Sequence, residues 1–147
     1  MISWVAIAER IARTAHAGQV DKSGQPYILH PERVARIVSG IVPDPEAVAA
    51  AWLHDVLEDT NVTSADLREE GVPASVIEVV ELMTHHADVS VEDYILGLRS
   101  HRIARAVKIA DLIDNSSPAR LDELPVSMRT RLREKYHLMW KTLLEDS

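Results

Sequence analysis

The fold of this chain is decided by the stretch Ala49-Ala50-Ala51-Trp52-Leu53-His54-Asp55-Val56-Leu57-Glu58-Asp59-Thr60, which sets one imidazole and three carboxylates directly behind an apolar run. The apolar half indicates a buried helix, and charged side chains are almost never fully buried unless they are paired or hold a metal. Positions four residues apart share a helix face, so Glu58 is expected below His54 and Asp59 below Asp55. The stretch therefore predicts two metal ligands one turn from two acid–base groups, as in a divalent-metal hydrolase.

Length and composition predict one globular domain covering residues 1–147. A chain of 147 residues can bury a sizeable core but is too short for two comfortable domains. Apolar residues make up 46% of the chain, which favours a packed fold over disorder. The sequence contains no cysteine, so it excludes disulfides and any metal site that uses thiolates.

Charge and hydropathy narrow the range of partners. No apolar run reaches the roughly 18 residues of a membrane span, and the start lacks a basic leader, so a soluble, cytoplasmic protein is expected. The net charge of −7 disfavours nucleic acids and anionic membranes as general partners. A small polyanionic substrate would therefore need metal ions and a few specific Lys or Arg side chains to bind it.

Helical periodicity runs through almost the whole chain, without continuous alternation of period two, and predicts an all-α domain of seven or eight helices. Residues 18–26 have the composition of a loop, and Gly71 is an expected helix stop. The expected helices cover residues 5–15, from 31 onward, from 45 through His54, 64–70, 73–85, 91–99, 103–114 and 126–144.

Several residues mark where these helices should begin. Ser3 is the expected N-cap of the first helix, and Pro31 should occupy the first position of the second, with His30 just outside it. Thr63 and Ser90 begin patterns that resemble capping boxes, with Asp in place of the usual Glu.

Two more segments contribute residues of the types that bind metals. His30 precedes a proline, a position that favours extended backbone and so a helix entrance. Asp111 lies in an otherwise apolar helix. Together His30, His54, Asp55 and Asp111 would form a His₂Asp₂ site for one divalent ion, and this donor set suits Mn²⁺, Fe²⁺ or Zn²⁺ better than Ca²⁺. The alternative for His54 and Asp55 is a buried, hydrogen-bonded pair that stabilises a helix end.

At this point the sequence resembles a known family. Gly18-Gln19 with the run from Lys22 to Pro31, the run from Leu53 to Thr60, and Lys108-Ile109-Ala110-Asp111 followed by Asn115 are similar to the HD hydrolase domain of the RelA/SpoT proteins. The resemblance extends from about Ala15 to Tyr136. It implies hydrolysis of the 3′-pyrophosphate of guanosine tetra- and pentaphosphate, the alarmones, with one divalent ion, Mn²⁺ in that family.

The resemblance also implies a role for individual residues. His30, His54, Asp55 and Asp111 match the metal ligands of the family. Glu58 and Asp59 match a catalytic pair that handles the attacking water and proton transfer. Three further residues match or approximate positions near the nucleotide substrate, and they are Lys22, Asn115 and Tyr136.

Phosphate-ester hydrolysis explains why these residue types would be needed. The reaction is slow in water because the nucleophile is weak and the transition state concentrates negative charge; a divalent metal activates water and offsets that charge. A carboxylate one turn away can accept a proton if it lies within hydrogen-bond reach. Proximity should raise one pKa of the Glu58–Asp59 pair and leave a group able to donate a proton.

Two positions depart from the family pattern. Asp21 stands where a basic residue usually precedes Lys22, and Leu112-Ile113 replaces a basic residue after the last metal ligand. Both changes remove positive charge near a polyphosphate. Three hypotheses therefore remain open: an alarmone hydrolase, a phosphatase or phosphodiesterase acting on another nucleotide, and a metal-holding sensor or binding domain without turnover.

The sequence gives weaker indications of a functional role for the remaining histidines, the last helix and two further basic residues. His85-His86 is expected at a solvent-exposed helix end, and His16 has no assigned partner. The last helix is expected to form core or a dimer surface, so a homodimer is a candidate assembly. Lys108 and Arg120 could each face phosphate or pair with acids, and the sequence does not decide between these roles.

Overall fold

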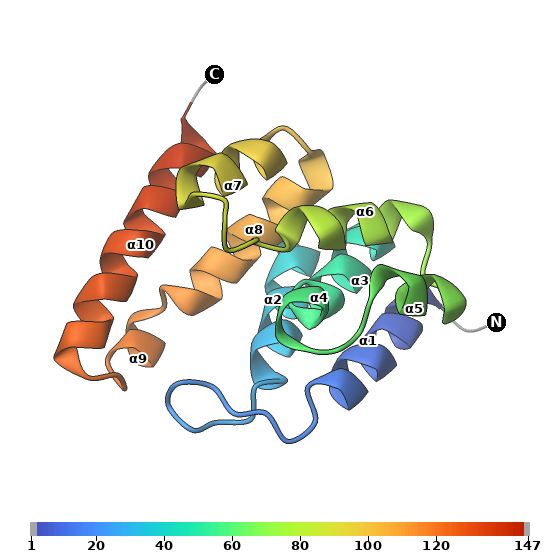
Figure 1. Ribbon diagram of the computed structural model, residues 1–147, viewed down its shortest axis with the longest axis horizontal. Coiled ribbons are helices and arrows are strands. Elements are labelled where there is room, and N and C mark those ends of the chain that lie inside the picture. Colours follow the sequence, from blue (N-terminus) through green and yellow to red (C-terminus); the bar gives the residue numbers. More distant parts are fainter. Residues whose placement is uncertain (1–2, 146–147) are drawn as a thin grey trace.

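The computed structural model describes residues 3–145, and in that range the chain folds into ten helices (Figure 1). The only β-type pairing within residues 3–145 is an isolated antiparallel bridge between Val20 and Pro26, in the loop between the first two helices. The all-α class is confirmed. The helices are α1 (Trp4–Ala15), α2 (Leu29–Ile41), α3 (Pro45–Leu53), α4 (Val56–Asp59), α5 (Ser64–Glu69), α6 (Ala74–Met83), α7 (Val91–Arg99), α8 (Arg102–Asn115), α9 (Pro118–Leu121) and α10 (Val126–Leu144).

Helix α3 forms the centre of the core. It packs against α1, α2, α6 and α8 (Figure 1). The helix is apolar on all sides, which is the pattern of a helix surrounded by others rather than lying on a surface. Its alanines present little side-chain bulk to these neighbours, and six of its nine residues are buried: Ala47, Ala49, Ala50, Ala51, Trp52 and Leu53.

Helices α7, α8 and α10 pack together on one side of α3. Helix α10 contacts α7 and α8, and its buried residues Leu132, Met139 and Leu143 confirm the core role expected for this helix. The homodimer stays a prediction. Within residues 3–145, no helix combines the length and apolar character that a membrane span requires.

Most predicted helix boundaries agree with the structure. Ser3 accepts a hydrogen bond from Ala6 N at 3.1 Å, and Thr63 forms a complete capping box with Asp66. Ser90 makes half of the motif, because its hydroxyl accepts from Asp93 N. Gly71 ends the α5 region with φ of +93°, a conformation that favours glycine.

Two predictions at the helix ends were wrong. The predicted helix through His54 ends at Leu53, and the chain turns at His54 and Asp55 before α4 begins. Asp55, with φ of −106° and ψ of −2°, departs from ideal helical angles but stays in the right-handed helical region, and Asp59 N bonds to Asp55 O at 2.9 Å. His30 lies inside α2, which begins at Leu29, rather than before it.

The helix count exceeds the seven or eight predicted because α4 and α9 are single turns of four residues each. Hydrophobic periodicity needs more than one turn to become visible, so segments of this length escape it. Short helices of this kind nevertheless position functional groups here, since α4 carries Glu58 and Asp59.

Candidate metal centre

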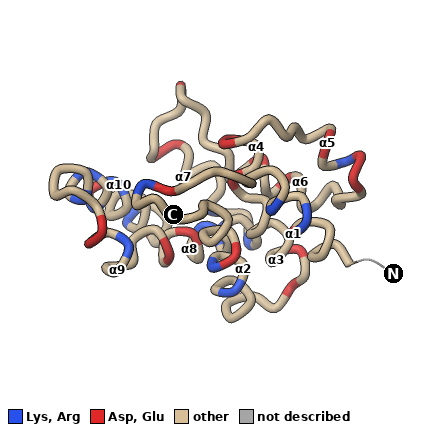
Figure 2. The backbone as a smooth tube through the Cα atoms, turned by 90° about the horizontal axis from the view of Figure 1, so that it is seen from below, with Lys and Arg blue, Asp and Glu red and all other residues tan. Residues whose placement is uncertain are grey.

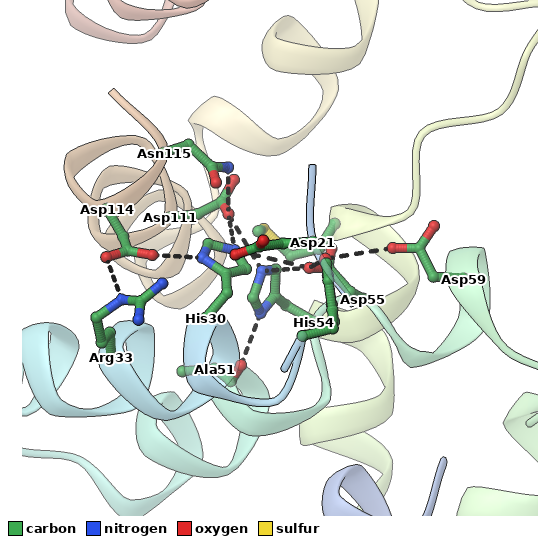
Figure 3. Close-up of polar contacts among 12 residues, drawn as sticks. Asp21, His30, Arg33, Ala51, His54, Asp55, Asp59, Asp111, Asp114 and Asn115 are labelled. Carbon is green, nitrogen blue, oxygen red and sulfur yellow. Dashed lines mark hydrogen bonds and ion pairs between the residues drawn. The ribbon is translucent and has the colours of Figure 1, made fainter. Parts of the chain in front are cut away.

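Four predicted ligand residues meet in the interior of the protein. His30, His54, Asp55 and Asp111 each present one donor atom, and these atoms lie within 4.8 Å of one another. They come from the first turn of α2, the turn between α3 and α4, and the middle of α8 (Figure 3). The turn that interrupts α3 therefore brings two adjacent residues, His54 and Asp55, to the same point.

Both imidazoles direct Nε2 toward the carboxylates. His30 Nε2 lies 2.9 Å from Asp111 Oδ1, and His54 Nε2 lies 3.2 Å from the same oxygen. His54 Nε2 is also 3.0 Å from Asp55 Oδ2. On the other side of its ring, His54 Nδ1 donates to Ala51 O at 2.7 Å. That bond places the ring proton on Nδ1 and leaves the Nε2 lone pair for a ligand.

The electrostatics of the cluster favour a bound cation. Burial opposes ionisation of Asp55, but the charge of His54 and its hydrogen bond outweigh burial and lower the pKa of Asp55 to about 2. Burial also opposes ionisation of Asp111, yet Lys108 and the two imidazoles hold its pKa well below the usual range. In return, the acids raise the pKa of His54 despite its burial. The carboxylates attract positive charge, which a divalent ion supplies while the ligands stay deprotonated.

The donor set also fits a transition metal. Two imidazole nitrogens and two carboxylate oxygens suit Mn²⁺, Fe²⁺ or Zn²⁺ better than an ion that selects oxygen alone. Asp111 divides its oxygens: Oδ2 accepts from Lys108 Nζ at 2.8 Å, whereas Oδ1 faces the imidazoles. Lys108 is buried and also lies 5.0 Å from the ring centroid of Tyr94. Its role is thus to pair with an acid of the cluster.

Sequence reasoning missed Asp114. This buried residue accepts from His30 Nδ1 at 2.6 Å and from Arg33 Nε at 2.7 Å (Figure 3). It also accepts from Arg120 at 2.8 Å. A carboxylate behind a ligating histidine fixes the tautomer and raises the basicity of the free nitrogen. The sequence feature that could have revealed Asp114 is its spacing of three residues from Asp111, which places both acids on one face of an apolar helix.

Tyr27 was also missed. Its hydroxyl lies 2.5 Å from Asp55 Oδ2 and 3.4 Å from Asp59 Oδ2. Burial and the nearby acids raise the pKa of Tyr27 far above its usual value, so the hydroxyl remains a donor. Tyr27 therefore connects a predicted metal ligand to a predicted catalytic acid. Its place three residues before His30 was the only local signal.

Glu58 and Asp59 lie near the cluster on the short helix α4, and Asp59 N bonds to Asp55 O at 2.9 Å as expected for positions one helical turn apart. Glu58 accepts from His85 N at 2.7 Å, which turns it toward the loop after α6. Asp59 instead lies near Tyr27, whose hydroxyl is 3.4 Å from Asp59 Oδ2. Partial burial and the negative charges of Asp55 and Glu58 raise the pKa of Asp59 to about 6. The pair thus contains one acid whose proton affinity is raised toward neutral pH, as predicted.

A cavity of about 580 Å³ opens onto these groups. A volume of this size is ordinary for a pocket that binds one small molecule. Three residues of the cluster, His54, Asp55 and Asp111, line the cavity wall, and so do Glu58 and Asp59. The three predicted substrate residues also contribute to the wall, and they are Lys22, Asn115 and Tyr136.

The three predicted substrate residues are not equally available. Lys22 is exposed, and Tyr136 is half-buried, with burial raising its pKa. Asn115 is already engaged, because its Nδ2 donates to Asp111 Oδ1 at 3.1 Å and its Oδ1 accepts from Arg120 at 3.0 Å. Asn115 therefore supports the cluster within the protein as well as facing the cavity.

The prediction of a solvent-exposed helix end at His85-His86 holds for His86, which is exposed, but was wrong for His85. Helix α6 ends at Met83, and the His85 ring stacks on Tyr94 with centroids 4.5 Å apart and planes 7° apart. Its Nε2 donates to Val89 O at 2.7 Å, so the ring is fixed in the cavity wall. Sequence spacing could not reveal this stack because Tyr94 lies on the following helix.

Fold and cluster together define an all-α protein with a His₂Asp₂ site that suits a divalent cation. Comparison with known families identifies it further. Residues 8–113 match the family model described as HD domain, and the chain belongs to that family. The matched range includes all four residues of the cluster.

Curated relatives carry similar segments. A guanosine-3′,5′-bis(diphosphate) 3′-pyrophosphohydrolase of Haemophilus influenzae is 55% identical over 71 residues, 48% of this chain and 10% of that protein. The bifunctional (p)ppGpp synthase/hydrolase SpoT of Escherichia coli K12 is 49% identical over 71 residues, again 48% of this chain and 10% of that protein. The chain thus spans only a small part of the length of these relatives.

One solved structure extends the likeness over the whole fold. It is described as a metazoan ortholog of SpoT that hydrolyzes ppGpp and plays a role in starvation responses. The match has a TM-score of 0.82 at 23% identity and covers 98% of this chain and 87% of the other. At that identity the comparison establishes a shared fold.

Proposed function

We propose that residues 1–147 act as one metal-dependent phosphohydrolase domain that removes the 3′-pyrophosphate from guanosine tetra- and pentaphosphate. The names of the relatives support this substrate, and the family supports the class of reaction. Hydrolysis would add water across the 3′ oxygen–phosphorus bond and release pyrophosphate together with a guanosine 5′-di- or triphosphate.

The observation that carries the proposal is the shared cavity. One cavity exposes three of the four cluster residues, His54, Asp55 and Asp111, together with the acids Glu58 and Asp59 and the side chains of Lys22 and Tyr136. A purely structural cluster would have no reason to open onto a space of nucleotide size beside two further acids. A non-catalytic binding domain would need the cavity but not the acid pair.

We assign His30, His54, Asp55 and Asp111 as ligands of one divalent ion, Mn²⁺ in first place and Fe²⁺ or Zn²⁺ as alternatives. A bound ion would supply a Lewis acid that activates water and offsets phosphoryl charge. His54 Nδ1 bonds to Ala51 O, and His30 Nδ1 bonds to Asp114. These two bonds orient the imidazoles for this role. The Tyr27 hydroxyl donates to Asp55 Oδ2 and holds that carboxylate in place.

We assign proton transfer to Glu58 and Asp59. The bond from His85 N fixes one oxygen of Glu58, and the other remains available to accept a proton from the attacking water. Asp59, whose pKa is raised to about 6, can carry a proton to the departing 3′ oxygen. Lys22, Asn115 and Tyr136 are assigned to nucleotide binding because they line the same cavity.

A nucleotide panel tests the proposal. The protein is incubated with Mn²⁺ and guanosine tetraphosphate, guanosine pentaphosphate, simple nucleoside mono-, di- and triphosphates, and cyclic nucleotides, while phosphate and pyrophosphate are measured separately. We expect pyrophosphate from the two alarmones alone. Phosphate from simpler nucleotides, or opening of a cyclic diester, would replace the proposal with a different hydrolase. No product from any member of the panel would indicate a binding domain.

A further inference from the structure

Gln19 holds the end of helix α4 across a separation of 40 residues in the sequence. Its Nε2 donates to Asp59 O at 3.0 Å, and Asp59 is the last residue of α4. A helix of four residues is too short to be stable by itself, and acids at its carboxyl end oppose the helix dipole. The acidic residues of α4 are marked red in Figure 2. The position of Asp59 therefore depends on contacts from other parts of the chain.

His16 lies behind Gln19 and fixes its side-chain amide. His16 Nδ1 lies 2.8 Å from Gln19 Oε1. Because the amide nitrogen of Gln19 donates to Asp59, its oxygen is the acceptor, and the ring proton is therefore on His16 Nδ1. The His16 ring also packs on the Tyr27 ring, with centroids 4.9 Å apart. His16 thus supports two side chains that approach Asp59, since the Tyr27 hydroxyl lies 3.4 Å from Asp59 Oδ2.

The main chain fixes these three residues relative to one another. Gln19 N donates to His16 O at 3.0 Å, and Tyr27 N donates to Gln19 O at 2.9 Å. Gly18 has φ of +81°, a conformation that favours glycine and turns the chain back at the end of α1. His16, Gln19 and Tyr27 therefore form one unit, here called the α4 brace. The brace reaches the main-chain carbonyl of Asp59 through Gln19 and its carboxylate through Tyr27.

The buried histidine of the α4 brace lowers the stability of the fold. His16 is 1% exposed, and its Nε2 has no hydrogen-bond partner within residues 3–145. An unpaired buried polar atom is unfavourable, whereas an apolar side chain of similar shape would fill the space without that loss. An apolar side chain could not donate to Gln19, however. The contact of His16 with Gln19 therefore points to a role other than packing.

We propose that Gln19 is a positioning residue that, supported by His16, holds Asp59 in place for proton transfer. The inference rests on the proposed function, in which Asp59 carries a proton to the departing oxygen. Without Gln19, the last residue of α4 loses its anchor, and the Asp59 carboxylate moves away from the position in which it can reach that oxygen. A displacement of about 1 Å at a reacting group is enough to slow a reaction on the order of 100-fold.

The test compares the same change at two glutamines of one loop. Gln19→Met keeps the side-chain length but removes both hydrogen bonds, and Gln25→Met is the control at an exposed position. KM and kcat are measured for the metal-loaded protein with guanosine 5′-diphosphate 3′-diphosphate. Gln19→Met should lower kcat roughly tenfold or more, with KM within about twofold of wild type and the metal content unchanged. Gln25→Met should behave as wild type. A raised KM with unchanged kcat would assign Gln19 to substrate binding and overturn the inference.

A double-variant cycle shows whether Gln19 acts through Asp59. Asp59→Asn keeps the main-chain carbonyl but removes the carboxylate, so adding Gln19→Met should lower kcat no further. Additive losses in the double variant would mean that Gln19 acts elsewhere, and the inference would fail.

Two variants of His16 test the support that it gives to Gln19. His16→Leu removes the donor and should lower kcat as Gln19→Met does. His16→Asn retains an amide that can donate to Gln19, and it should recover most of the activity. Equal losses in the two variants would show that the hydrogen bond from His16 contributes nothing to positioning.

Hydrogen exchange separates this inference from the proposed function. The amides of Asp59 and Thr60 bond to Asp55 O and Val56 O within the α4 turn. Their exchange should be roughly tenfold faster in Gln19→Met but not in Gln25→Met, because the anchor of the turn is lost. If no nucleotide is cleaved, faster exchange retains the anchor and rejects the proposed reaction. Unchanged exchange, or faster exchange with unchanged kcat, rejects the positioning role.

Discussion

Asp114 Oδ2 lies 2.6 Å from His30 Nδ1, across a separation of 84 residues in the sequence. The contact fixes the ring so that Nε2 points to Asp111 and Asp55, 2.9 and 3.7 Å away. Arg33 and Arg120 hold the same carboxylate from its other sides, so it cannot rotate away without leaving buried charges unpaired. The orientation of His30, a predicted metal ligand, is therefore set by Asp114, which is not one of the predicted ligands.

We expect Asp114→Asn to weaken metal binding by about 10- to 100-fold, the usual effect of losing a carboxylate behind a ligating histidine. The amide can still accept from Nδ1, but it is neutral and leaves the imidazole less basic. Affinity is measured by competition with a metal chelator. Asp122→Asn, an exposed acid that pairs with arginines, is the control. Equal affinity in Asp114→Asn and wild type would show that Asp114 only supports the fold.

His54→Ala and Asp111→Ala should each abolish bound metal and activity, because each removes one of four converging donors. Elemental analysis of the purified variants measures the first effect. Wild-type protein should also gain thermal stability on addition of Mn²⁺, by about 2.7 kcal/mol when the free ion is at 100 times its Kd. The two variants should show no such gain. A well-occupied site in either variant contradicts the ligand assignment.

Glu58→Gln should retain the metal and lower kcat by about 100-fold or more, the typical contribution of a general acid–base group. Glutamine can still accept from His85 N, so the loop contact survives while the proton acceptor is lost. Glu78→Gln, at an exposed position of α6, is the matched control. If Glu58→Gln keeps full activity, proton transfer belongs to Asp59.

His16 gives the unfolding free energy a pH dependence that can be measured. Burial lowers the pKa of His16, and its Nδ1 is bonded to Gln19 at 2.8 Å. Its buried Nε2 has no hydrogen-bond partner within residues 3–145. The unfolded chain, with an ordinary histidine pKa near 6.5, therefore takes up a proton before the folded chain does. The contribution of His16 should therefore lower the free energy of unfolding as pH drops below about 6.5, whereas His54, whose pKa is raised by the nearby acids, acts in the opposite direction.

Urea unfolding of metal-free protein at pH 7.5 and pH 5.5 isolates this contribution. Between these two pH values the free energy of unfolding of His16→Gln should change in a more favourable direction than that of wild type. His137→Gln, which removes an exposed histidine of α10, serves as the control and should follow wild type. Parallel pH profiles for His16→Gln and wild type would show that His16 does not contribute.

Local patterns in the sequence predicted much of the helical framework. The bounds of α7 and α10 agree with the prediction, and the Thr63 capping box forms as its spacing indicates. These features depend on residues within a turn or two of one another, whose contacts are set by helix geometry alone. The order of the HD-type motifs also identified the four residues that converge.

Tertiary structure decided the chemistry of the site. Helix α3 ends at Leu53, and in the turn that follows Asp55 reaches both Tyr27 and the imidazoles, contacts that the helical pattern did not predict. The contacts of Asp114 with His30, and the approach of α10 to the Lys22 loop, join segments more than 80 residues apart. Periodicity records which face of a helix is buried, but not which distant side chain that face will meet, because the pairing depends on how the helices pack.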